Sequence, residues 1–111
     1  MKIFYYILDS SLWRPVPIFK MQEIEVEEKP KAYMFGETIP YSYYNQRVSK
    51  EDIGIIQKEC NKIYLFLFER NDDLAKEKFI KYLNSQIEGL ENQIKNVEEK
   101  KRIVIDFKEE A

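Results

Sequence analysis

The sequence contains no histidine and only one cysteine, and these two gaps exclude several kinds of chemistry. Without histidine there is no Ser-His-Asp or Cys-His catalytic group, no imidazole metal ligand and no histidine pH switch. A single cysteine, Cys60, makes neither an internal disulfide nor a thiolate zinc site. Because a lone unpaired thiol suits a reducing compartment, we expect the protein to be cytoplasmic.

The chain also has few glycines, no long apolar run and little net charge. Three glycines do not spell a phosphate-binding loop, so we expect no cofactor. The apolar runs Ile3–Leu8 and Ile63–Phe68 are far too short to span a bilayer, so we expect no membrane insertion. A net charge of −2 argues against a strongly basic nucleic-acid-binding domain, but it does not exclude a local basic patch.

What is present predicts a single α+β domain over residues 1–111. Hydrophobic residues make up 44% of the chain and aromatic residues 14%, which is enough for one packed core. We expect a sheet-rich part over residues 1–70, a long helix over residues 71–101 and a strand or tail over residues 102–111. The strand pattern there is the alternation of Ile103, Ile105 and Phe107 with more polar neighbours.

The sheet-rich part reads as a small antiparallel sheet with one short helix. Lys2–Leu8 is apolar on both faces, which predicts a central strand, and Ile63–Phe68 is a buried strand that would pair with it. Further strands are expected at residues 23–28, 32–35 and 41–46. Ser49, with Asp52 three residues later, predicts a helix that runs from Lys50 to Cys60 and is weakened by Gly54.

The long helix carries a heptad pattern. Its apolar residues are spaced 3, 4, 3, 4 and 3 apart, with β-branched residues at a and mainly leucine at d, which favours a two-stranded coiled coil. We call these residues the seam and expect them to form a homodimer interface: Ile80, Leu83, Ile87, Leu90, Ile94 and Val97. The competing solution is a break at Gly89 that folds the last turns back on the same chain.

No constellation of residues predicts catalysis, so we expect the protein not to be an enzyme. Adjacent carboxylates such as Glu27 and Glu28 point to opposite faces of a strand and do not share a substrate. The sequence Glu27-Glu28-Lys29 has the spelling of a nuclease E-x-K strand, but only Asp9 offers a nearby partner. A metal-dependent hydrolase is therefore a remote alternative, and no metal site is expected.

One segment, Tyr41–Lys50, gathers aromatic, amide and basic groups. Tyr41, Tyr43 and Tyr44 are compatible with a strand core, with a protein contact, or with base stacking in which Arg47 holds a phosphate. Trp13 is either a lid on the core or an exposed anchor. The candidates for binding a partner are therefore Trp13, Tyr41, Tyr43, Tyr44 and Arg47.

The amino-acid composition and the order of two short motifs indicate a source for the protein. The residue types with AT-rich codons (Phe, Tyr, Met, Ile, Asn and Lys) supply 52 residues, against 14 for Gly, Ala, Arg and Pro, which indicates an AT-rich genome. Val26-Glu27-Glu28-Lys29-Pro30-Lys31-Ala32-Tyr33 and Ser49-Lys50-Glu51-Asp52-Ile53-Gly54 precede the long Ile/Leu helix. This order resembles small uncharacterised phage and mobile-element proteins of low-GC bacteria, which have a strand-rich front and a coiled-coil-like back.

These observations lead to one expectation about function and one alternative. We expect a non-catalytic, dimeric protein-interaction protein, an accessory protein of a phage or mobile element that binds or inhibits a host or defence factor. The alternative is a nucleic-acid-binding module that uses the Tyr41–Lys50 segment.

Overall fold

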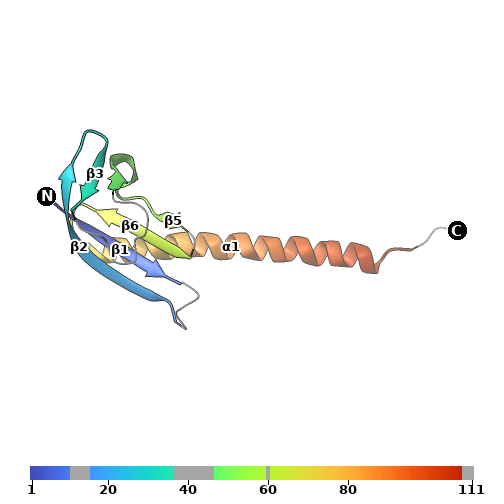
Figure 1. The fold of residues 1–111 in the computed structure, drawn as a ribbon. Helices are drawn as coiled ribbons and strands as arrows, with labels where there is room; N and C mark the ends of the chain where they lie inside the picture. Colours follow the sequence, from blue (N-terminus) through green and yellow to red (C-terminus); the bar gives the residue numbers. More distant parts are fainter. Residues whose placement is uncertain (11–15, 37–46, 60, 109–111) are drawn as a thin grey trace. The chain divides into compact units, whose positions relative to one another are not determined.

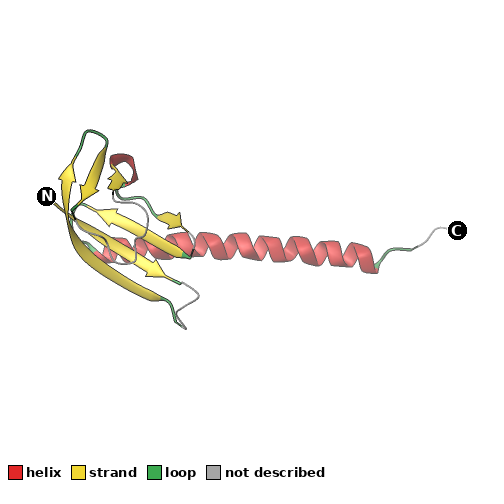
Figure 2. Ribbon diagram, in the orientation of Figure 1, coloured by secondary structure: helices red, strands yellow, loops and turns green. Residues whose placement is uncertain are grey.

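The computed structural model describes residues 1–10, 16–36, 47–59 and 61–108. Within them the chain forms strands followed by one long helix, an α+β fold (Figures 1 and 2). The elements are β1 (Lys2–Asp9), β2 (Ile18–Glu28), β3 (Ala32–Phe35), β4 (Arg47–Ser49), the 3₁₀ turn η1 (Lys50–Asp52), β5 (Gln57–Glu59), β6 (Lys62–Leu67) and α1 (Asp72–Ile105). The chain divides into two compact units, Met1–Lys78 and Phe79–Ala111, so α1 begins in the first and continues through the second.

The strands make one antiparallel sheet, as the sequence predicts. Its order in the described residues is β4-β3-β2-β1-β6-β5. β1 lies in the middle, with Ile3 opposite Ile24 of β2 and Tyr5 opposite Phe66 of β6. The predicted pairing of the two most apolar segments is therefore confirmed, and a central strand with two apolar faces is covered on both sides.

One face of the sheet, the core face, holds the main hydrophobic cluster. Side chains alternate between faces along a strand, so this cluster takes every second residue of β1 and its partners on neighbouring strands. Aromatic rings fill its middle: the ring centroids of Tyr5 and Phe66 are 5.0 Å apart, and those of Phe35 and Phe66 are 5.6 Å apart. The buried members are Ile3, Tyr5, Ile7, Ile24, Val26, Tyr33, Val48 and Phe66.

The opposite face of β1 is tied to the start of α1 through Tyr6. The buried Tyr6 hydroxyl donates a hydrogen bond to Asp72 Oδ1 at 2.7 Å and accepts one from the Asn71 backbone N–H at 3.2 Å. Asn71 is the helix cap, because its Oδ1 accepts the Leu74 N–H at 3.0 Å. One phenol thus joins the central strand to the first turn of the helix.

Asp72 is also held by a charge. Arg70 donates to both of its carboxylate oxygens, at 3.3 and 3.2 Å. The hydrogen bonds from Arg70 and then from Tyr6 lower the pKa of Asp72 below its ordinary value. The carboxylate lies in the first turn of α1, where a negative charge also suits the helix dipole.

The predicted helix from Lys50 to Cys60 is wrong. Only Lys50–Asp52 turns, as a 3₁₀ turn, and the Ser49 side chain makes no capping hydrogen bond to it. Gly54 has a φ of +81°, a left-handed conformation that suits glycine and ends the turn. The chain then enters β5, where Gln57 to Glu59 pair with β6. Cys60 itself lies outside the described residues.

The predicted strand from Arg102 to Phe107 is also wrong. α1 runs on to Ile105, and the Asp106 N–H donates to the Arg102 carbonyl at 2.9 Å. A strand must find a partner strand for its backbone groups, whereas an extended helix satisfies them internally. Six alternating residues do not outweigh a helix already propagating through the preceding turns. α1 also passes through Gly89 without a break, so the fold-back at this glycine does not occur.

Candidate protein-interaction surfaces

The seam lies on α1, and most of it is exposed within this chain. At 3.6 residues per turn, spacings of 3 and 4 place all six seam residues on one side of the helix. Leu83 is half-buried. The other five are each more than half exposed: Ile80, Ile87, Leu90, Ile94 and Val97.

The continuation of the helix lengthens the seam beyond what the sequence predicted. With the helix extended to Ile105, the next heptad places Lys101 at position a and Val104 at position d. Val104 is 74% exposed, more than any of the five exposed seam residues. The heptad pattern was not predicted to reach Val104, because the alternation of Ile103, Ile105 and Phe107 indicates a strand.

Polar side chains border the seam on both sides. The e positions hold Asn84, Glu91 and Glu98, and the g positions hold Gln86, Gln93 and Lys100. Gln86 Nε2 donates to the Tyr82 hydroxyl at 3.1 Å, one turn earlier. An apolar stripe between polar borders has the composition of an interface core with its rim.

The second group of predicted candidates falls mostly outside the described residues. Trp13, Tyr41, Tyr43 and Tyr44 lie there, as does the strand predicted over residues 41–46. Arg47 is described and is exposed at the start of β4. Lys50, the next cation of this segment, is paired: its Nζ lies 2.9 Å from Glu28 Oε1 and 5.4 Å from the centroid of the Tyr33 ring.

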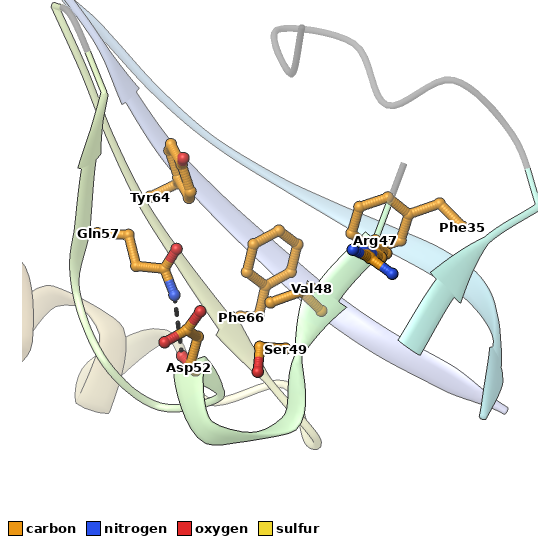
Figure 3. Close-up of a pocket in the computed structure, with 8 residues that line it drawn as sticks. All are labelled: Phe35, Arg47, Val48, Ser49, Asp52, Gln57, Tyr64 and Phe66. Atoms are coloured by element: carbon orange, nitrogen blue, oxygen red, sulfur yellow. Dashed lines mark hydrogen bonds between the residues drawn. The ribbon is translucent and has the colours of Figure 1, made fainter. Parts of the chain in front are cut away.

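Arg47 lines a small pocket on the core face of the sheet. The pocket has a volume of about 180 Å³ and opens between β4 and β5–β6 (Figure 3). Its floor is aromatic, since Phe66 stacks with Phe35 and meets Tyr64 edge to face. The lining residues are Phe35, Arg47, Val48, Ser49, Asp52, Gln57, Tyr64 and Phe66.

No sequence motif indicates this pocket. Its residues come from five elements that only the curvature of the sheet brings together. The sequence predicts that Asp52 helps to cap a helix, but this helix does not form, so the Asp52 carboxylate does not have that role. Arg47 is thus the one predicted candidate that the described structure places in a concave site.

Two features are absent from the described ranges, a membrane-spanning helix and a cluster of metal-binding side chains. No helix there combines the length and the apolarity needed to cross a lipid bilayer. No three His, Cys, Asp or Glu side chains in these ranges gather closely enough to hold a metal ion.

Comparison with models of protein families, with curated proteins and with solved structures finds no match.

Proposed function

We propose that this is a non-catalytic protein-interaction protein that self-associates through the seam of α1. The observation that carries the proposal is the exposure of the seam, with five of its six residues more than half exposed in a single chain. Burying a large aliphatic side chain is worth about 1.5–3 kcal/mol, so an unpartnered stripe of this length is costly in water. A partner that covers it removes that cost.

A second copy of the chain is the partner that fits best. The stripe from Ile80 to Val104 is about 36 Å long at 1.5 Å per residue, which is ample for a coiled-coil contact. In a parallel, in-register pair, Gln86 and Gln93 lie beside Glu91 and Glu98 of the other copy, so no like charges meet across these borders. Twofold dimers are also the commonest closed assembly.

The proposed biological role follows from source rather than from geometry. The amino-acid composition, which indicates an AT-rich genome, and the resemblance to phage and mobile-element proteins favour an accessory protein whose target is a host or defence factor. Affinity capture from a lysate of an AT-rich host, with the seam intact and with the seam disrupted, tests this part. A host protein retained at stoichiometric yield in both cases supports it.

A matched pair of double variants tests self-association. Leu90→Glu with Ile94→Glu places two charges in the seam. Asn92→Glu with Asn96→Glu places the same charges, at the same spacing, on the polar side of the helix. Light scattering after gel filtration is expected to show a monomer for the seam variant and a dimer for the control. Equal masses for the two would refute the assignment of the interface.

A further inference from the structure

The pocket beside Arg47 presents two opposite charges that no described residue neutralises. No ion pair or hydrogen bond within the described residues engages the Arg47 guanidinium or the Asp52 carboxylate. The view in Figure 3 shows the Phe66 ring between these two side chains. A ligand resting on this ring therefore meets a cation on one side and an anion on the other.

The remaining lining completes a mixed site. Val48 and Phe66 are buried and form an apolar floor with Phe35. The Ser49 hydroxyl makes no capping bond, and the Gln57 amide donates to the Asp52 carbonyl at 3.4 Å, which leaves its own oxygen to accept. A hydroxyl and an amide thus lie beside an aromatic surface, which is the usual composition of a small-molecule site.

The size of the pocket limits what it can hold. A volume of about 180 Å³ is close to the roughly 150 Å³ of a cavity that holds one benzene molecule. It is smaller than the roughly 300–1,000 Å³ of sites for drug-sized ligands. The occupant is therefore a molecule with one apolar group, rather than a nucleotide or a cofactor.

We infer that this pocket binds a free α-amino acid with an apolar side chain. Arg47 would take the α-carboxylate, for which its forked donors are suited, and Asp52 would take the α-ammonium group. The apolar side chain would lie on Phe35, Val48 and Phe66. Each charged end of the ligand then neutralises one of the two unpaired charges, which neither a simple anion nor a simple cation does.

Nuclear magnetic resonance titration of the full chain tests this inference. L-leucine and L-phenylalanine are expected to shift the backbone amides of Val48, Ser49, Asp52 and Gln57. L-leucinamide lacks the carboxylate and N-acetyl-L-leucine lacks the ammonium group. Both are expected to bind at least about tenfold more weakly than L-leucine, since each loses a charged hydrogen bond.

Two variants and two matched controls complete the test. Arg47→Gln and Asp52→Asn are expected to weaken leucine binding about tenfold. Lys58→Gln and Glu51→Gln change the same charges at exposed neighbouring positions outside the pocket and are expected to leave it unchanged. Absence of shifts at about 10 mM of either amino acid, equal binding of N-acetyl-L-leucine, or equal losses in the controls would overturn the inference.

Discussion

Two adjacent tyrosines of β1 have almost the same burial and opposite hydrogen bonding. Tyr5 is 2% exposed and Tyr6 is 1% exposed. The Tyr6 hydroxyl makes two hydrogen bonds at the start of α1, with Asp72 and Asn71. The Tyr5 hydroxyl has no hydrogen-bond partner among the described residues, and burial raises the pKa of Tyr5 far above its usual range. The two phenols therefore contribute to stability in different ways.

The substitution Tyr6→Phe is expected to destabilise the fold by about 1–2 kcal/mol, because it removes two hydrogen bonds, one of them to a carboxylate, that join β1 to the start of α1. Tyr5→Phe is expected to change the free energy of unfolding by less than about 0.5 kcal/mol, or to increase it, because no hydrogen bond is lost. Urea unfolding followed by circular dichroism measures both. Equal losses in the two variants would contradict this assignment of the hydrogen bonds.

Asp72 makes the stability depend on pH in a known direction. Its pKa is lowered in the folded protein, so the unfolded chain binds the proton more tightly. The stabilisation is therefore present above the unfolded pKa of about 4 and is lost as the pH falls through the folded pKa.

Thermal unfolding of the unmodified protein and of Asp72→Asn tests this dependence at several pH values. The unmodified protein is expected to melt higher at pH 7, and the difference is expected to shrink as the pH falls below the unfolded pKa of about 4 and through the folded pKa. The difference is small, because the Asp72 side chain is 47% exposed. A constant difference across this pH range would show that the charge of Asp72 is not responsible.

At the scale of elements, the strands expected at residues 2–8, 23–28, 32–35 and 63–68 and the long helix were predictable, whereas the segment from residue 50 to 60 was not. Uninterrupted apolar patterns predict the strands Lys2–Leu8 and Ile63–Phe68, and a cap predicts the helix that begins beyond Asn71. The pattern of residues 50–60 is misleading, because the cap-like Ser49 is followed by Gly54, whose left-handed φ ends the turn early. The sequence of this segment alone does not show that β6 is available to pair with β5.

The end of α1 is a second place where the local sequence pattern does not predict the structure. Ile103, Ile105 and Phe107 alternate as in a strand, yet the helix continues because no strand partner is needed for its backbone. The pocket was unpredictable for a third reason, since the curvature of the sheet, and no motif, assembles its lining. Of the candidate residues, the seam could be read from the sequence, whereas the role of Asp52 could not.

Lys101 allows a test of the proposed dimer and its register. It occupies an a position, where two copies in parallel register place two lysines against each other at a cost in stability. Lys101→Ile is expected to tighten the dimer at least tenfold, or by about 1.4 kcal/mol. Lys95→Ile makes the same change on the polar side of α1 and is expected to have no such effect. Analytical ultracentrifugation separates the two, and equal effects would argue against this register.

For the whole molecule, the proposed self-association would link the stability of α1 to protein concentration. The seam is exposed in one chain, so a bound partner would supply the apolar contacts of the distal turns of α1. On this proposal, mass action predicts that the helix melts at higher temperature as the concentration rises. A chain that functions as a monomer has no such dependence.

The mass of the unmodified protein in solution tests the central claim most directly. Sedimentation equilibrium across the micromolar range is expected to show a species of about 27 kDa, twice the 13.5 kDa of one chain, dissociating only on dilution. A mass of 13.5 kDa at every concentration would contradict the proposal that the seam of α1 pairs two copies of the protein.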